Sequence, residues 1–376
     1  MVSRGYLERR SSPDSRTVRQ TIDLPTLHAL GMGAAVLSAG GGSYPYLECL
    51  VARDVLSTCG DVPMIDVSTL KDNTRVAMVC MAGAPLPLFE RFVDADHFTR
   101  PVRALEQRLG QRFEAIAGYE IGSMNGIIPV IIAAKTGLPL LDVDTFGRSF
   151  PEGRMTSFAL AGVDMTPMAL SDIRDNDVII ENSVNGDWTE TILRSVTTSY
   201  GSIAALASAT NAGTLKRHGI AGTYSRAIRL GSALLEAQAT RADWSDLLTK
   251  TEQGLVLARG RIADVERTTT GGFVRGKIRI DDTKTGASVS VHFQNEYAVV
   301  EQDGNVISTV PDLICVFDSE RGEPIGTEAL RYAQAVTVIS MPPAAIHLTG
   351  RALRTVGPRG FGYDFDYQSP HKGGAA

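Results

Sequence analysis

The stretch RVAMVCMAG, residues 75–83, is a short and almost continuous run of apolar side chains. Runs of this kind are typical of strands that are buried on both faces, as the strands of parallel sheets are. The runs FEAIAGYE (113–120) and LPLLDVDTF (138–146) carry the same signal, and between them NGIIPVIIAAKTG (125–137) has the composition of a buried helix. Strands and helices that alternate along the chain predict a layered α/β domain with crossover connections.

The residue pattern changes near residue 254. Beyond this point apolar and polar residues alternate, as in ASVSVHFQNEYAVV (287–300), which is the period of antiparallel strands. We therefore expect an α/β N-terminal domain with a largely parallel or mixed sheet, followed by a β-rich domain of barrel or sandwich type. The predicted division is residues 1–20 as a disordered tail, 21–253 as the α/β domain, 254–345 as the β-rich domain, 346–367 as a C-terminal segment that returns to the first domain, and 368–376 as a tail.

The composition is that of a globular protein of two domains rather than of a nucleic-acid-binding or membrane protein. The chain has 376 residues, of which 43% are hydrophobic and 21% are charged, and its net charge is -5. A negative net charge provides no basic footprint for nucleic acid, and no apolar segment reaches the roughly 18 residues of a membrane span. The four cysteines lie far apart without a C-x-x-C pair, which favours free thiols and a cytoplasmic location.

Three consecutive glycines interrupt the apolar pattern in SAGGGSYP, residues 38–45. Their position before a helix presents unpaired N–H groups, which suit a carboxylate, an oxyanion or a phosphate. A dinucleotide fingerprint would follow a strand with the spacing G-x-G-x-x-G, whereas GMGAAV (31–36) lacks the third glycine and falls in a predicted helix. We therefore expect a small acidic or polarisable molecule and no nucleotide here, the alternative being a plain tight turn. Ser43 is expected to cap the following helix.

Carboxylates follow two of the predicted strands, at the edge where open α/β sheets bind their ligands. Glu120 ends one strand, and Asp142 and Asp144 end another at a spacing of two that would place both on one face. Solvated strand ends are the alternative, and a D-x-D pair can also hold a divalent metal. The six histidines form no H-x-H or H-E-x-x-H pattern. Further charged side chains follow in the next loop at Arg148, Glu152 and Arg154.

Longer motifs occur in one order along the chain and resemble those of the S-methyl-thiohydantoin desulfurase family, which is often grouped with hydantoinase and oxoprolinase proteins. The similarity runs from about Thr21 to Tyr367. It implies an α/β domain followed by a β-rich domain, in agreement with the pattern of strands and helices. The motifs that carry it include GGGSYPYL (40–47), GYEIGSMNG (118–126), DVDTFGRSFPEGRM (142–155), ADVERTTTGGFVRG (263–276), FQNEYAVVEQDG (293–304) and VGPRGFGYDFDY (356–367).

The resemblance implies that water attacks C2 of a five-membered thiohydantoin ring and that sulfide or methanethiol leaves. Such a reaction needs a base for the water, an acid for the leaving group and donors for the charge that develops on the ring. We expect Glu120, Asp142 and Asp144 to supply base and acid, one of them with a raised pKa, since clustered carboxylates resist joint ionisation. Candidates for substrate binding are the backbone N–H groups of Gly41, Gly42 and Ser43, the side chains of Asn125 and Glu152, Arg148 and Arg154 for a substrate carboxylate, and Asn295 and Glu296 from the second domain.

Two departures from the family pattern accompany these residues. The family sequence GTGGGGDP is SAGGGSYP in this chain, so that Ser43 and Tyr44 replace an acidic residue, and His347 stands where a tryptophan is expected. Such changes would suit another heterocycle or a member that has lost activity. The alternatives are therefore an enzyme acting on another small cyclic amide, a non-catalytic partner subunit of a hydantoinase- or oxoprolinase-like assembly, and a nucleotide-dependent enzyme. The sequence leaves open whether Asp142 and Asp144 bind a divalent metal, and no nucleotide is expected. A homo-oligomer is expected because enzymes of this size commonly form one.

Overall fold

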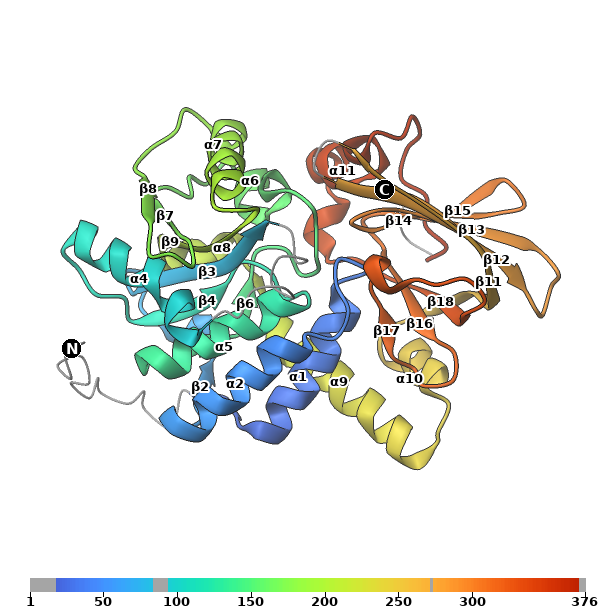
Figure 1. Cartoon of the computed structure of the whole chain (residues 1–376), viewed down its shortest axis with the longest axis horizontal. Helices are drawn as coiled ribbons and strands as arrows, with labels where there is room; N and C mark the ends of the chain where they lie inside the picture. Colours follow the sequence, from blue (N-terminus) through green and yellow to red (C-terminus); the bar gives the residue numbers. More distant parts are fainter. Residues whose placement is uncertain (1–17, 84–93, 271–272, 372–376) are drawn as a thin grey trace.

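The computed structural model describes residues 18–83, 94–270 and 273–371, which form two regions lying side by side (Figure 1). Each region is built on an eight-stranded sheet, and the N-terminal sheet has the strand order β1-β2-β5-β4-β3-β9-β7-β8. The strands of the N-terminal sheet are β1 (Val18–Ile22), β2 (Val62–Ile65), β3 (Arg75–Gly83), β4 (Ala115–Gly118), β5 (Leu140–Leu141), β7 (Met168–Ser171), β8 (Asp177–Ile180) and β9 (Ile203–Asn211).

Parallel pairing is confined to the middle of the N-terminal sheet. Strands β2, β5, β4 and β3 pair in parallel, and α4 (Ala95–Leu109) and α5 (Met124–Thr136) lie in the crossovers that such pairs require. Antiparallel strands complete both edges, β1 at one end and β9, β7 and β8 at the other. This mixed sheet confirms the predicted α/β domain. Strand β1 includes the end of the predicted tail, while residues 1–17 lie outside the described residues.

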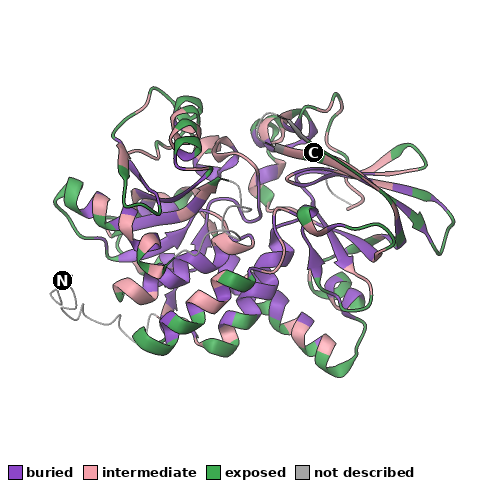
Figure 2. Ribbon diagram, in the orientation of Figure 1, coloured by how far each residue is buried: buried purple, intermediate pink, exposed green. Residues whose placement is uncertain are grey.

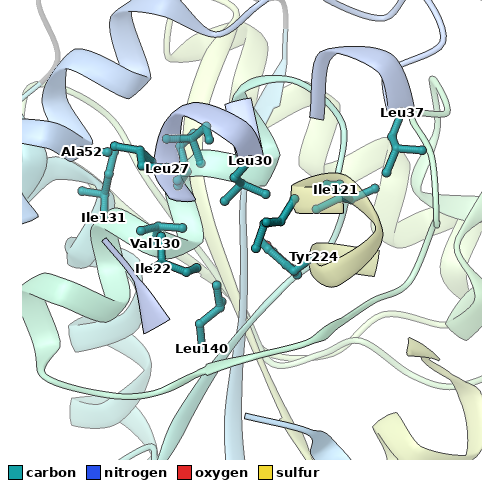
Figure 3. Packing of buried hydrophobic residues seen from close by; sticks show 14 of the residues in the cluster. Ile22, Leu27, Leu30, Leu37, Ala52, Ile121, Val130, Ile131, Leu140 and Tyr224 are labelled. Atoms are coloured by element: carbon teal, nitrogen blue, oxygen red, sulfur yellow. The ribbon is translucent and has the colours of Figure 1, made fainter. Parts of the chain in front are cut away.

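Helices cover both faces of the N-terminal sheet, so that the strands between them are buried (Figure 2). The first face packs against α1 (Leu24–Leu37), α2 (Tyr46–Cys59), α4, α5 and α9 (Thr223–Thr240). The second packs against η2 (Val67–Thr69), α6 (Ser157–Ala161), α7 (Gly186–Ser199) and α8 (Ala212–His218). No helix in the described part of the chain is long and apolar enough to cross a bilayer. Side chains of the first core include Leu27, Leu30, Val130, Ile131, Leu140 and Tyr224 (Figure 3).

The C-terminal sheet is antiparallel throughout, which confirms the predicted β-rich region. Its order is β15-β14-β13-β12-β11-β18-β16-β17, and β14 also contacts β16, so the sheet curls around its own apolar core. Its strands are β11 (Leu255–Thr270), β12 (Phe273–Asp282), β13 (Ser288–Gln294), β14 (Glu296–Gln302), β15 (Asn305–Thr309), β16 (Leu313–Asp318), β17 (Pro324–Ile325) and β18 (Ala335–Met341). Smaller elements are β6 (Val143–Asp144), which pairs with β10 (Ile220–Ala221), and η3 (Gly153–Met155), α10 (Trp244–Thr251) and η4 (Thr327–Ala329).

The last described segment packs where the two regions meet. Helices η5 (Ala345–Leu348), α11 (Gly350–Val356) and η6 (Pro358–Phe361) follow β18. The segment that was expected to return to the first domain therefore contacts both regions. Its buried residues Ala352, Val356 and Phe361 share a core with Phe146, Phe150 and Met155 from the first region and with Ala298, Val299 and Val310 from the second.

Glycines allow α1 and α9 to touch backbone to backbone. A Cβ atom on Gly33 would lie 1.8 Å from the carbonyl oxygen of Ala227, and one on Gly231 would lie 1.7 Å from that of Ala29. These distances are far below van der Waals contact, so any side chain would push the helices apart. The glycines of GMGAAV therefore serve helix packing inside α1, which confirms that this motif lies in a helix.

We expect the substitution Gly231→Ala to lower the free energy of unfolding by about 2 kcal/mol or more, because overpacking outweighs the gain in helix propensity of up to about 1 kcal/mol. Thermal and urea unfolding of the purified protein measure the change. The control is Gly186→Ala in α7, where a Cβ would meet nothing within 4 Å. Equal stability of the two variants would contradict the close approach of α1 and α9.

Candidate active site

Glu120 lies at the carboxyl end of the parallel strand β4, at the edge of the sheet where the sequence predicted a site. Its Oε1 accepts a hydrogen bond from Ser149 Oγ at 3.0 Å, and Asn125 Nδ2 lies 3.4 Å from the same oxygen. Burial raises the pKa of Glu120 to about 7, although the two hydrogen bonds oppose the shift. The residue nevertheless keeps part of its surface exposed, so it is a carboxyl group that is desolvated but still reachable.

Glu296 brings a second carboxyl group to this place from β14 of the other region. It is only 4% exposed, and its Oε2 has no hydrogen-bond partner among the described residues. Burial, together with the charge of Glu120, raises the pKa of Glu296 to about 8, while Arg148 acts in the opposite direction. A Cβ on Gly41 would lie 2.7 Å from Glu296 Oε1 and 3.1 Å from Cβ of Ser149, the residue that donates to Glu120. Glu120 and Glu296 therefore lie close enough for their charges to interact, and we call them the carboxyl pair.

Asp144 connects two loops near the carboxyl pair through hydrogen bonds. Its carboxylate accepts the N–H groups of Ile121 at 2.8 Å and Gly147 at 2.9 Å, which joins the loop after β4 to the loop after β6. Burial raises the pKa of Asp144 well above its usual range, and these N–H bonds oppose the shift. The sequence predicted this side chain as an acid or base, and the structure places it behind Glu120 with both oxygens already hydrogen-bonded.

Asp142 contacts a different part of the chain from Asp144. It accepts the N–H of Ser225 at 3.0 Å and its hydroxyl at 2.5 Å, and Arg19 Nη1 lies 3.1 Å away. The reason is that β5 ends at Leu141 and β6 pairs with β10, so the chain does not continue as one regular strand. Asp142 thus anchors the start of α9, and the two aspartates do not converge on one ligand.

Arg148 joins the two regions from inside the protein. Its side chain is fully buried, and Nη1 donates to the carbonyl oxygens of Pro311 at 3.0 Å and Asp312 at 2.6 Å. Nε donates to the Ser149 carbonyl at 3.0 Å, and the guanidinium lies 4.7 Å from the centre of the Phe150 ring. Burial lowers the pKa of Arg148 and the charge of Glu296 opposes this, so the arginine faces the carboxyl pair.

Arg154, the other arginine expected to hold a substrate carboxylate, already binds a carboxylate of the chain. Glu152 accepts from its Nε at 2.5 Å and from its Nη2 at 3.0 Å. A substrate carboxylate would have to displace Glu152 from the guanidinium group of Arg154. The structure therefore offers no support for a substrate clamp formed by Arg148 and Arg154 together.

The triple-glycine loop is shaped by contacts between the regions. Gly40 has φ +93°, and a Cβ there would lie 2.5 Å from the Tyr297 ring; one on Gly42 would lie 2.6 Å from Ser123 Oγ. The N–H of Gly41 donates to the Ser38 carbonyl at 2.9 Å. The loop thus uses its glycines for close approach of the second region, and the Gly41 N–H is engaged within the chain.

Ser43 does not cap α2, contrary to the sequence prediction. The helix begins at Tyr46 after Pro45, without a side-chain cap. Instead, both the N–H and the hydroxyl of Ser43 donate to Glu328 Oε1, at 3.0 and 2.7 Å, and Gly326 N–H donates to Ser43 Oγ. A serine shortly before a proline is a common pattern at a helix N-terminus, which is why a cap was predicted. Ser43 instead binds the carboxylate of a residue that is 285 positions away along the chain.

The two asparagines of the predicted site have different surroundings. Asn125 accepts the Met81 N–H at 2.8 Å while its amide nitrogen faces Glu120, so it connects β3 with the carboxyl pair. Asn295 has φ +59°, accepts the Val274 N–H at 3.1 Å and shapes the turn between β13 and β14. It positions Glu296, its neighbour in the chain.

His347 and Ser149 complete the surroundings of the carboxyl pair. His347 is 1% exposed and lies edge-on to Phe150 at 5.2 Å, and burial lowers its pKa to about 3, so the ring is neutral. Neither ring nitrogen has a hydrogen-bond partner within the described ranges. Ser149 was not predicted from the sequence, and its place in the motif TFGRSF is the only signal that marked it.

The described residues do not contain a group of three or more His, Cys, Asp or Glu side chains arranged to hold a metal ion. Asp142 and Asp144, the candidate ligands, bind hydrogen-bond donors at separate places. This donor set does not fit a metal centre.

Comparisons with known proteins agree with this architecture. Family models described as S-Me-THD-like, N-terminal domain, and S-Me-THD-like, C-terminal domain, match residues 25–182 and 184–370. A protein from Chromobacterium violaceum, solved by X-ray crystallography in a structural genomics programme, has the same fold with a TM-score of 0.78 and 23% identity. The match covers 94% of this chain and 100% of that chain. No curated protein matches the chain. The two family models meet at residue 183, between β8 and α7, whereas the change in residue pattern lies at residue 254.

We expect Glu296→Gln to make stability less dependent on pH. The folded-state pKa of about 8 exceeds the ordinary value of 4.5, so between these values the folded protein binds more protons than the unfolded chain and wild-type stability falls as the pH rises. Glutamine does not titrate, so the variant does not undergo this loss of stability. The difference in stability between the variant and the wild type should therefore grow, in favour of the variant, from pH 4.5 to pH 8. Melting temperatures across this range measure the effect.

The matched control for this experiment is Glu236→Gln, which neutralises an exposed carboxylate on α9. Its melting temperature should follow that of the wild type at every pH. A constant difference between wild type and Glu296→Gln would contradict a raised pKa at this position.

Proposed function

Because the chain belongs to the S-Me-THD-like family, we propose that it is an enzyme that hydrolyses the C–S bond at C2 of a thiohydantoin or S-methyl-thiohydantoin-like ring. Membership of the family suggests a related enzyme function, and the bond and the ring are the specific part of the proposal. The observation that carries it is the carboxyl pair, since two carboxyl groups with different environments can act as base and acid in one reaction.

Glu120 is suited to the role of base. With a pKa of about 7 and part of its surface exposed, it is substantially ionised near neutral pH and can reach a water molecule. It would take a proton from the water as the new C2–O bond forms. Ser149 and Asn125 hold its carboxylate, which fixes the direction from which the water is activated.

Glu296 is suited to the role of acid. With a pKa of about 8 it is mostly protonated at neutral pH, and its Oε2 is without a partner in the described part of the chain. It would give its proton to the sulfur as the C2–S bond breaks. An S-methyl-thiohydantoin and water then become a hydantoin and methanethiol, and the proton received by Glu120 returns to Glu296 or to solvent.

Two roles assigned from the sequence change in this proposal. Glu296 takes the part of acid that was expected of Asp142 or Asp144, because their carboxylates are held by backbone and side-chain donors. We further propose that the protein works in the cytoplasm as a homo-oligomer, without a nucleotide. A hydantoinase-like partner protein belongs to the alternative in which this chain is a non-catalytic subunit.

We expect the purified protein to release methanethiol or sulfide from a panel of S-methyl-thiohydantoins and thiohydantoins. Glu120→Gln and Glu296→Gln should each lower kcat/KM by about 100-fold or more, the usual contribution of a general acid or base. The rate should rise with pH through about 7, as Glu120 ionises, and fall through about 8, as Glu296 loses its proton. Thiol release measured with a disulfide reagent follows the reaction.

Glu236→Gln is again the control, and it should retain wild-type activity. Hydantoin itself and related cyclic amides are included, because their hydrolysis without thiol release would favour the alternative substrate class. If folded, metal-supplemented wild-type protein acts on none of these rings, the enzymatic proposal fails and the partner-subunit alternative replaces it.

A further inference from the structure

A hollow lies in the C-terminal region, apart from the carboxyl pair. It has a volume of about 360 Å³ and is bounded by β11, β12, β13 and the segment after η6. The C-terminal segment that closes it lies beside β14 (Figure 1). The lining includes none of Glu120, Asp144, Arg148 and Glu296. We call this hollow the Arg275 pocket, and its charged and aromatic lining residues include Glu266, Arg267, Arg275, Lys277, His292, Phe361 and Tyr363.

The register of the sheet brings the polar side chains together. Arg275 and Lys277 are two residues apart on β12, so they project from the same face of the sheet. Lys277 is paired with His292 on β13, which therefore projects from that face as well. Alternation along antiparallel strands is thus the reason that three basic side chains line one hollow.

Positive charge exceeds negative charge in the Arg275 pocket. Lys277 lies 3.6 Å from Glu266, and His292 lies 3.1 Å from Glu301, so these two have acidic partners. Arg267 is paired with Gly276 and therefore projects from the opposite face of the sheet, where its Nη2 donates to the carbonyl oxygens of Thr327 at 2.6 Å and Leu330 at 2.9 Å.

Arg275 has no carboxylate within ion-pair distance among residues 18–83, 94–270 and 273–371. The charge of Arg275 is therefore not matched by an acidic partner, and the hollow suits an anion.

Aromatic residues also line the hollow. Tyr363 meets His292 edge-on at 6.3 Å and lies 5.4 Å from Phe365, which holds its ring in place. Phe361 is 2% exposed and lines the hollow from the same segment. Burial raises the pKa of Tyr363 to about 12, so its hydroxyl stays protonated at neutral pH, and the charge of Arg275 acts on it in the opposite direction. A ligand here would meet both the guanidinium of Arg275 and the aromatic surface of Tyr363.

We propose that the Arg275 pocket binds a small planar organic carboxylate, with the carboxylate on the guanidinium of Arg275 and the planar part against Tyr363. A guanidinium fork binds a carboxylate through two parallel hydrogen bonds. Aromatic walls favour a flat ligand over a compact inorganic ion, and the volume lies in the range of small-molecule sites. This site does not depend on the function proposed for the carboxyl pair.

The test uses benzoate as the probe, titrated into the full-length protein by calorimetry. We expect saturable binding by the wild type, and binding at least about tenfold weaker for Arg275→Gln, the loss typical of a charge-assisted hydrogen-bonded pair. Arg279→Gln is the matched control: it removes a charge from the same strand, where Arg279 pairs with exposed Asp281 outside the hollow. This variant should bind benzoate as the wild type does.

Acetate and inorganic phosphate test the class of ligand. Both should compete with benzoate only weakly, because neither offers a flat face to Tyr363. Tyr363→Leu, a second variant, should weaken benzoate binding while leaving the melting temperature close to that of the wild type. Absence of saturable binding by the wild type, equal binding by Arg275→Gln and Arg279→Gln, or equal competition by phosphate would each overturn the proposal.

Discussion

The buried guanidinium of Arg148 is the contact on which the arrangement of the two regions depends. A permanent charge inside a protein is tolerated only where it is hydrogen-bonded and matched by opposite charge. Arg148 donates to carbonyl groups of the second region, and the negative charges of Asp312 and Glu120 act on its guanidinium in the stabilising direction. The same contact holds Ser149 and Phe150 in place, and Ser149 in turn binds Glu120. Domain contact and site geometry therefore rest on one side chain.

The carboxyl pair is a consequence of that contact. Glu120 comes from the end of a parallel strand and Glu296 from a turn in an antiparallel sheet, and neither would be desolvated if the two regions were apart. Burial is the largest cause of the raised pKa of both residues. Burying two ionised carboxylates side by side would cost much free energy. The pair therefore retains a proton near neutral pH. The site thus has proton-transfer groups without a histidine.

Local sequence patterns predicted most of the first region and the class of the second. The apolar run 75–83 became β3, the glycine-containing segment before residue 38 became α1, and the alternating segments beyond residue 254 became antiparallel strands. The roles of single polar residues were harder to predict. Ser43 was expected to be a helix cap and binds Glu328, and Arg154 was expected to bind substrate and binds Glu152. Glu328 is 285 residues away from Ser43 along the chain, whereas Glu152 is a neighbour of Arg154 whose pairing with it was not predicted from the sequence.

The sequence by itself determined the order of elements, the family and the edge of the sheet at which Glu120 lies, because strand and helix periodicity and long motifs are local properties of the chain. Only the tertiary structure decided which carboxylates meet. Asp142 and Asp144 are two residues apart yet bind different partners, whereas Glu120 and Glu296 are far apart in the chain and interact through their charges. Desolvation and charge coupling act through space, so the pKa values that would make a base and an acid exist only after the two regions have packed together.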